Sequence, residues 1–331
     1  MVTQLNSEQA LKAFDLILPF IPELGPFLTD EAIQDICING NGTVYVDRCG
    51  QMRCAGRNVL DSKKLMFALQ RIARQGGEEL DESNPFLDSR LPDGSRIAAA
   101  IAPYSVGGPT VTIRKFQRQH FSLDHLVELG TLTHELADLL RGASKARTNI
   151  LISGQPGSGK TSIQNALLNE LDVTRARLLV IEESAELQIH AENVTRFECR
   201  NVGKQVTIRD LVKVALRHRP DHLVIGEVRG AEAMDLLDAL NTGNSGSLTT
   251  IHANSAQSAL TKLSNLALRA SADVPYAAVQ AQIADVIQYV IHMERKGNKR
   301  SVAELLRLCS YDFRNNAFQF ELVFEGNQRH D

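Results

Sequence analysis

The chain has 331 residues, of which 43% are hydrophobic and 23% charged, a mix typical of folded globular proteins rather than of low-complexity or collagen-like chains. Its length predicts two domains, each large enough for its own core. With 36 Lys and Arg residues against 39 Asp and Glu, the formal net charge is −3. This charge excludes a bulk positive field for nucleic acid or anionic lipid, but not a local basic patch.

The first part of the chain is predicted to be a mixed α+β unit. Apolar residues recur at helical spacing from Ser7 to Leu18, and an Asn-Gly turn at residues 39–42 separates two apolar runs, which is a strong hairpin signal. The segment from Asp61 to Arg74 has the pattern of an amphipathic helix. The runs RIAAAIAPY and PTVTIRKF predict two strands joined by a glycine-rich turn. We expect these strands to form an antiparallel sheet.

The rest of the chain has the pattern of an α/β domain. The nearly continuous apolar runs NILIS, RLLVIEES, HLVIG and SLTTIH are separated by helix-length stretches, as in parallel strands buried on both faces. Two more strands are predicted on either side of a turn at residues 314–316. We therefore predict an amino-terminal domain over residues 1–117, a linker or hinge over 118–130, and an α/β domain over 131–331.

Cysteine usage and hydropathy bear on the compartment. The five cysteines are Cys37, Cys49, Cys54, Cys199 and Cys309. An odd and scattered set argues against a disulfide framework and indicates a reducing compartment. The amino terminus has no apolar stretch behind a positive charge, so no signal peptide is predicted. No apolar run approaches about 18 residues, so no membrane-spanning helix is predicted.

A phosphate-binding loop follows the predicted strand NILIS and precedes a predicted helix, which is the context that this motif requires. Its glycines let successive backbone N–H groups point at phosphates, and the amino end of the helix adds a positive dipole. Lys160 would reach the β- and γ-phosphates, and the Thr161 hydroxyl would ligate magnesium. The predicted ATP-binding residues are Gly154, Gln155, Pro156, Gly157, Ser158, Gly159, Lys160, Thr161 and Ser162.

Acidic residues follow two of the predicted strands. Glu182 and Glu183 end one run, and Glu227 follows another. Reactive groups in open α/β sheets sit at the carboxyl ends of strands, where carboxylates can hold magnesium through water or accept a proton from attacking water. The alternative is structural, since acidic residues commonly start the helix that follows a strand.

His252 ends a fourth apolar run. A histidine at a strand end is more often a structural group than a catalytic one. Because this strand should neighbour the phosphate-loop strand in the sheet, we expect His252 to sense the terminal phosphate.

At these residues the chain resembles the traffic ATPases of type II and type IV secretion, conjugation and pilus assembly. Four motifs of that family occur in order: the phosphate loop, the acidic box VIEESAEL, the strand PDHLVIGEVRGAEA and the histidine box GNSGSLTTIHANS. The amino-terminal half is similar in DICINGNGTVYVDR, RLPDGSRIAAAIAP and TVTIRKF. Within the family the chain is most similar to the tight-adherence pilus ATPases (CpaF type) and the conjugative-transfer ATPases (TrbB type).

The resemblance implies roles for single residues. Glu182 would polarise water, Glu227 would be the second-strand carboxylate, and His252 would be the histidine-box residue. Relatives usually have Glu-Asp where this chain has Glu182-Glu183. Glu183 is expected at the magnesium with Thr161, but which of the two glutamates orients water stays open. In the family, arginines approach the nucleotide from the other domain, and the matching residues are Arg90 for nucleotide binding and Arg96 and Arg114 for catalysis.

The resemblance also implies a RecA-like P-loop ATPase domain preceded by a smaller, PAS-like α+β domain. It further implies a hexameric ring, with nucleotide between the two domains, that works with ATP and Mg²⁺. The protein would be cytoplasmic and peripheral to the inner membrane, held there by proteins of a secretion, pilus or conjugation machinery. No direct sequence-specific contact with nucleic acid is expected.

Other function classes compete with the motor. One is a nucleotide-regulated assembly scaffold with little turnover. Another is a small-molecule phosphotransferase or a nucleic-acid translocase of the same fold, although the negative net charge argues against the translocase.

Overall fold

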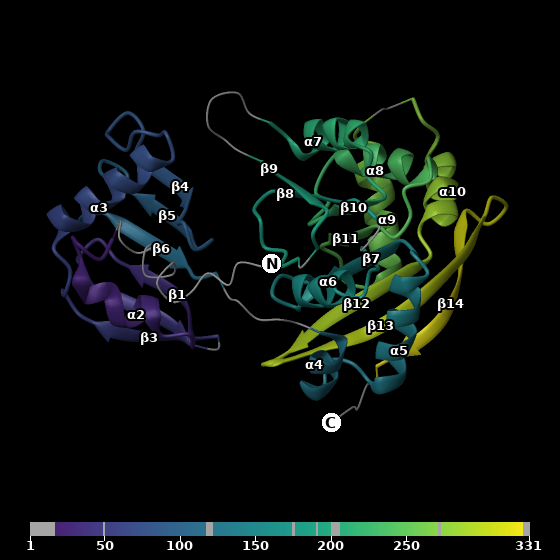
Figure 1. Cartoon of the computed structure of the whole chain (residues 1–331), viewed down its shortest axis with the longest axis horizontal. Coiled ribbons are helices and arrows are strands. Elements are labelled where there is room, and N and C mark those ends of the chain that lie inside the picture. The colour runs from purple at the N-terminus through teal and green to yellow at the C-terminus, as the bar shows by residue number, and fades with distance from the viewer. Residues whose placement is uncertain are drawn as a thin grey trace. The chain divides into compact units, whose positions relative to one another are not determined.

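The structure is a computed structural model and describes residues 17–48, 50–116, 122–173, 176–189, 191–199, 206–270 and 273–326. The chain divides into two compact units, Met1–Gln119 and His120–Asp331, and Figure 1 labels the larger elements of each. The helix predicted from Ser7 falls almost entirely outside the described residues, as does Cys49. The other four cysteines are free thiols.

An antiparallel sheet organises the first unit. Its described residues contribute six strands in the order β3-β2-β1-β6-β5-β4. The predicted Asn-Gly hairpin is confirmed as β1 and β2, and the two predicted strand runs are confirmed as the pair β5–β6. The elements are β1 (Ile33–Ile38), β2 (Val44–Arg48), β3 (Gln51–Gly56), β4 (Phe86–Arg90), β5 (Arg96–Ala100), β6 (Thr110–Arg114), η1 (Pro22–Leu24), α2 (Gly25–Thr29) and α3 (Ser62–Gln75).

Helix α3 covers one face of this sheet. It begins where the Asp61 carboxylate accepts hydrogen bonds from the backbone N–H groups of Lys63 and Lys64, which otherwise have no partner in the helix. Its apolar stripe, including Leu69 and Ile72, is buried in one cluster with the inward-facing strand residues. Each such Leu or Ile side chain stabilises the unit by about 1.5–3 kcal/mol on burial. The predicted amphipathic helix is therefore confirmed.

A larger, mixed sheet organises the second unit. In its described part, eight strands lie in the order β14-β13-β12-β7-β11-β10-β8-β9. The strands from β12 to β9 pair in parallel, whereas β13 and β14 are antiparallel. The strands are β7 (Ile150–Gly154), β8 (Leu178–Glu182), β9 (Val194–Glu198), β10 (His222–Ile225), β11 (Leu248–Ile251), β12 (Tyr289–Lys296), β13 (Lys299–Asp312) and β14 (Ala317–Glu325). The four predicted parallel strands and the final hairpin are confirmed, while β9 and β12 were not predicted.

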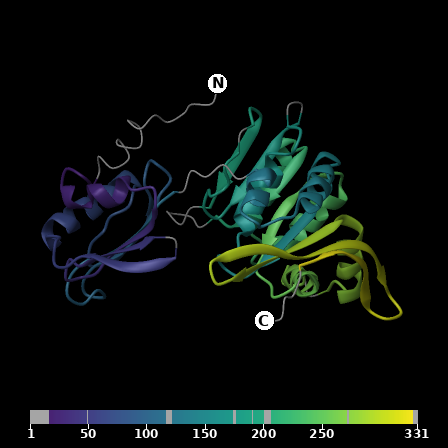
Figure 2. The same ribbon diagram turned by 90° about the horizontal axis from the view of Figure 1, so that it is seen from below.

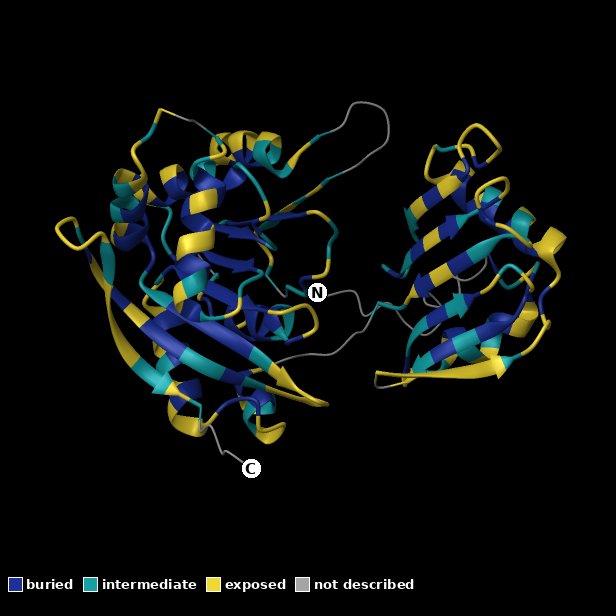
Figure 3. Ribbon diagram, turned by 180° about the vertical axis from the view of Figure 1, so that it is seen from behind, coloured by how far each residue is buried: buried dark blue, intermediate teal, exposed yellow. Residues whose placement is uncertain are grey.

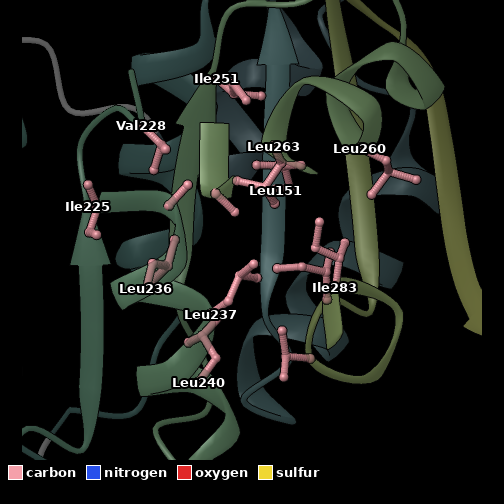
Figure 4. Close-up of a cluster of buried hydrophobic side chains, with 14 of the residues drawn as sticks. Leu151, Ile225, Val228, Leu236, Leu237, Leu240, Ile251, Leu260, Leu263 and Ile283 are labelled. Carbon is pink, nitrogen blue, oxygen red and sulfur yellow. The ribbon is translucent and has the colours of Figure 1, made fainter. Parts of the chain in front are cut away.

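Helices pack on both faces of the second sheet (Figures 1 and 2). Leu151 points to one face with residues of α8, α9 and α10, as the close-up in Figure 4 shows, and its neighbours Ile150 and Ile152 lie in a separate cluster with α4, α5 and α6. The central strands are accordingly buried along their whole length (Figure 3). The helices are α4 (Leu123–Glu128), α5 (His134–Lys145), α6 (Lys160–Leu168), α7 (Ile208–Ala215), η2 (Leu216–His218), α8 (Glu232–Asn241), α9 (Ala256–Ala267) and α10 (Tyr276–Val286).

Part of the segment predicted as a linker is a helix. Residues 117–121 lie outside the described part of the chain, but α4 follows directly and is capped by the Ser122 hydroxyl. Leu123 and Leu126 are buried in the cluster that includes α5 and α6. Arg141 on α5 donates hydrogen bonds to Asp124 on α4 and to Glu170, which lies just after α6.

None of the helices within the described residues is both long enough and apolar enough to cross a bilayer.

Candidate active site

The phosphate loop joins β7 to α6, and its backbone requires glycine at specific positions. Gly154 has φ = 150° and Gly159, which caps α6, has φ = 98°. A Cβ atom on Gly154 would lie 2.4 Å from the carbonyl oxygen of Met293 on the neighbouring strand β12. A side chain there would collide with backbone, so the close approach of the loop to β12 depends on glycine.

Lys160 is the cation inside this loop. Only 7% of its surface is exposed, and its Nζ donates hydrogen bonds to the carbonyl oxygens of Gly154 and Gln155, both at 3.0 Å. Burial lowers the pKa of Lys160, and the charge of Glu227 opposes that shift. The loop therefore holds a desolvated ammonium group that an anion would stabilise further.

His252 connects this lysine to a carboxylate. Strand β11 pairs with β7, as expected from the sequence, and His252 Nδ1 lies 3.1 Å from Lys160 Nζ. Its Nε2 lies 2.9 Å from Glu227 Oε1. The same Nδ1 lies 3.3 Å from the Gly154 carbonyl oxygen, so the ring contacts the phosphate loop as well as the lysine. The three predicted residues form one continuous chain of contacts.

Arg229 joins the second glutamate of the acidic box to this chain. It donates through Nη2 to Glu227 Oε2 at 2.9 Å and through Nη1 to Glu183. The hydrogen bond to Glu227 raises the pKa of the Arg229 guanidinium. Glu183 and Glu227, which follow neighbouring strands β8 and β10, are thus held by one guanidinium.

Glu182 has a different environment. The residue is 3% exposed. Its Oε1 accepts hydrogen bonds from the N–H groups of Glu186 and Leu187 at 2.7 and 2.8 Å, and its Oε2 accepts from Arg196 at 2.9 Å. Burial raises the pKa of Glu182, against the charge of Arg196. Oε1 thus holds the segment after β8 and Oε2 pairs with a residue of β9, and the role of Glu182 in polarising water stays a prediction.

The three arginines predicted from the first unit lie side by side. Arg90 on β4 is directly opposite Arg96 on β5, which is directly opposite Arg114 on β6. Directly opposed residues of antiparallel strands share a face, so the guanidinium groups form a row. Arg114 forms an ion pair with Asp35 on the next strand, with 3.0 Å between Nε and Oδ1. Their predicted approach to nucleotide stays a prediction.

The sequence comparison decides the family. Residues 23–314 match the family model described as "Type II/IV secretion system protein". This protein belongs to the type II/IV secretion family. It is 34% identical over 297 residues to the conjugal transfer protein TrbB of Rhizobium radiobacter, covering 89% of this chain and 88% of that protein. It is 31% identical over 308 residues to the probable conjugal transfer protein TrbB of Sinorhizobium fredii, covering 92% of each. The predicted family, on its TrbB-type side, is confirmed.

Solved structures show the same fold for this secretion-family protein. The pilus retraction motor PilT with bound ADP superposes with a TM-score of 0.63 at 18% identity, covering 94% of this chain and 84% of that one. The Legionella pneumophila ATPase DotB gives a TM-score of 0.64 at 17% identity, covering 87% and 80%. The predicted architecture, a RecA-like P-loop domain preceded by a smaller α+β domain, is confirmed.

Some contacts of the site could not be foreseen. The Gln155 side chain in the phosphate loop donates to the Asn254 side-chain oxygen, two residues after His252. Lys262 Nζ donates to the His252 carbonyl oxygen at 2.7 Å. The only sequence signal was that Asn254 stands inside the histidine box. These contacts connect the phosphate loop to the β11–α9 segment, which a single sequence does not pair.

The remaining loop residues offer few ligands to a metal ion. Thr161 and Ser162 occupy the first turn of α6 and are partly exposed, and Ser158 is buried. Within the described residues no group of three or more His, Cys, Asp or Glu side chains could hold a metal. A magnesium ion fits such a site when one or two protein oxygens are supplemented by phosphate oxygens and water.

Proposed function

We propose that this protein binds ATP at the phosphate loop, hydrolyses it and uses the energy to drive macromolecular transport. The observation that carries the proposal is the chain of contacts from Lys160 through His252 to Glu227. This chain brings a cation, a histidine and a carboxylate to one loop, which supports the roles proposed for them. Phosphoryl transfer depends mainly on such positioning and charge stabilisation.

Each residue has a definite task in this proposal. The loop N–H groups and the amino end of α6 hold the phosphates, and Lys160 exchanges its carbonyl partners for phosphate oxygens. Glu227 accepts the proton of the attacking water, and His252 orients that carboxylate through Nε2. Thr161 and Glu183 would hold Mg²⁺, which supplies positive charge to the phosphates.

We also propose a hexameric ring in which the arginine row reaches nucleotide. Arg96 and Arg114 would neutralise charge that develops on the transferred phosphoryl group, and Arg90 would bind the nucleotide. Their alignment across three strands supports this, since three guanidinium groups on one face favour a polyanion.

Arg114→Ala is expected to lower turnover with nucleotide affinity largely kept. Arg48→Ala is the control, because it removes an arginine of β2 in the same sheet that pairs with Asp30, the residue after α2.

The relatives suggest the biological setting. Proteins of this length and similarity are named for conjugal transfer. By analogy, we propose that this protein serves a conjugation or type IV secretion machinery at the cytoplasmic face of the inner membrane, attached through its partner proteins.

Phosphate release by the purified full chain tests the enzymatic proposal. Wild type is expected to hydrolyse ATP, Lys160→Ala to lose nucleotide affinity, and Glu227→Gln to retain affinity but lose turnover. Glu321→Gln is the matched control, because this exposed glutamate on β14 pairs only loosely with Arg307, at 3.6 Å. Light scattering with and without nucleotide measures the mass of the assembly and so tests for the hexameric ring.

Two results would contradict the motor. Equal phosphate release by wild type and Glu227→Gln would favour the nucleotide-regulated scaffold. Unchanged ATP affinity of Lys160→Ala, measured by calorimetry, would remove the phosphate loop from the site.

A further inference from the structure

The hairpin of β12 and β13 places two arginines against the phosphate loop. Arg300 Nε donates a hydrogen bond to the Gly157 carbonyl oxygen at 2.9 Å. A Cβ atom on Gly157 would lie 3.4 Å from Arg295 Nη1, and one on Gly159 would lie 3.3 Å from Arg300 Cδ. Both arginines therefore lie along the loop itself, and the Arg300 stem covers Gly159.

The two guanidinium groups come from the side of the loop opposite to His252. Strand β12 pairs with one edge of β7, whereas β11, which carries His252 at its end, pairs with the other edge (Figure 1). Glu227 follows β10, beyond β11. The loop is thus flanked by the Lys160–His252–Glu227 chain on one side and by two arginines on the other.

The positions of these arginines are unfavourable without an anion. Arg295 and Arg300 are directly opposite each other on the paired strands, and like charges in such positions destabilise a sheet. Among the described residues no carboxylate forms an ion pair with either. Arg295 Nε donates instead to the Gly297 carbonyl oxygen at 2.8 Å. A carboxylate is present on this hairpin, but Glu294 pairs with Lys296, with 3.2 Å between Nζ and Oε2.

We propose that Arg295 and Arg300 bind the nucleotide through its sugar-proximal phosphates, on the side of the loop away from Glu227. The proposal rests on the proposed function, because that function places Lys160, His252 and Glu227 around the terminal phosphate. A planar guanidinium with several N–H donors matches phosphate oxygens well. Both side chains are exposed, so a ligand can reach them.

Calorimetry with ADP and ATP on the full chain tests this assignment. Arg295→Gln, Arg300→Gln and the double variant are compared with wild type. The double variant is expected to bind ADP and ATP about tenfold more weakly, by the same factor for both nucleotides, since charge-assisted hydrogen bonds are lost. Its ADP affinity is also expected to depend less on salt, because fewer charges contact the phosphates. Arg307→Gln, an exposed arginine on β13 paired with Glu321, is the control.

Three outcomes would overturn the proposal. The first is unchanged affinity in the double variant, and the second is a loss confined to ATP, which would place the arginines at the terminal phosphate. The third is a loss in Arg300→Gln with a lower melting temperature while Arg295→Gln binds like wild type, which would reduce the feature to a support for Gly157. If wild type itself bound no nucleotide, the proposed function would fail; if wild type binds and the variants match it, only this inference fails.

Discussion

Glu182 and Glu227 each stand at the carboxyl end of a buried parallel strand, yet the structure gives them opposite surroundings. Glu182 directs both oxygens to its own strand-to-loop segment and to Arg196. Glu227 directs its oxygens to His252 and Arg229, at the phosphate loop. A strand end therefore supplies a location for a carboxylate, while the residues of the neighbouring loop determine what that carboxylate can do.

The same difference appears in solvent access. The Glu182 side chain is 4% exposed and that of Glu227 is 20% exposed. A carboxylate that accepts two backbone N–H groups and a guanidinium has little capacity left for water, whereas Glu227 retains access to solvent. We therefore expect Glu227 to affect turnover and Glu182 to affect the folded state.

Substitution of the two glutamates should change the rate of ATP hydrolysis to very different extents. Glu227→Gln is expected to lower phosphate release at saturating ATP about 100-fold, as loss of a general base typically does. Glu182→Gln is expected to lower it less than about tenfold, because the amide oxygen can still accept the two backbone N–H groups. Equal losses of phosphate release in the two variants would contradict the different roles of Glu182 and Glu227.

Removing the arginine partner of each glutamate should lower the free energy of unfolding by different amounts. Arg196→Gln leaves a buried carboxylate without its cation and is expected to lower the free energy of unfolding by roughly 2 to 3 kcal/mol, less than for a fully buried pair because Arg196 is 37% exposed. Arg229→Gln removes a more exposed partner and is expected to cost about 1 kcal/mol or less. Urea unfolding of both variants measures these changes, and a reversed order would contradict the assignment of Glu182.

The raised pKa of Glu182 makes the free energy of unfolding depend on pH. The folded protein binds this proton more tightly than the unfolded chain, so the resulting stabilisation is complete below the ordinary pKa of 4.5 and is lost as pH rises through the raised value. Glu182→Gln lacks this titration. The difference in free energy of unfolding between variant and wild type should therefore move in favour of the variant as pH rises above 4.5. A difference that stays constant over this range would contradict the prediction.

The weakest effect is expected for the hydrogen bond between Gln155 in the phosphate loop and Asn254 in the β11–α9 segment. Gln155→Ala and Asn254→Ala are each expected to change the KM for ATP a few-fold. Because the two side chains hydrogen bond to each other, the double variant should resemble either single variant, with a coupling energy of about 0.5–1.5 kcal/mol. Additive effects in the double-mutant cycle would show that the contact does not couple the loops.

Much of the fold could be predicted because local rules agree with the tertiary result. The spacing of glycines after the apolar run NILIS predicted the β7–loop–α6 unit, and further apolar runs completed the set of four predicted parallel strands. The sequence missed β3, which is almost wholly exposed and has no apolar alternation, and β9, which contains Arg196 between partly exposed residues. These strands form because the backbone of the neighbouring strand supplies hydrogen-bond partners. That pairing leaves no pattern in the strand's own sequence.

The phosphate loop can be recognised without a structure, since backbone angles reserved for glycine and a lysine at a fixed spacing are local properties. The order of motifs that identifies the secretion family can be read from the sequence as well. The folded arrangement alone shows that Glu227 contacts His252 while Glu182 is enclosed, and that Arg295 and Arg300 lie against Gly157. Those contacts depend on strand order and register, which bring together residues far apart in the chain, and neither composition nor spacing encodes that geometry in readable form.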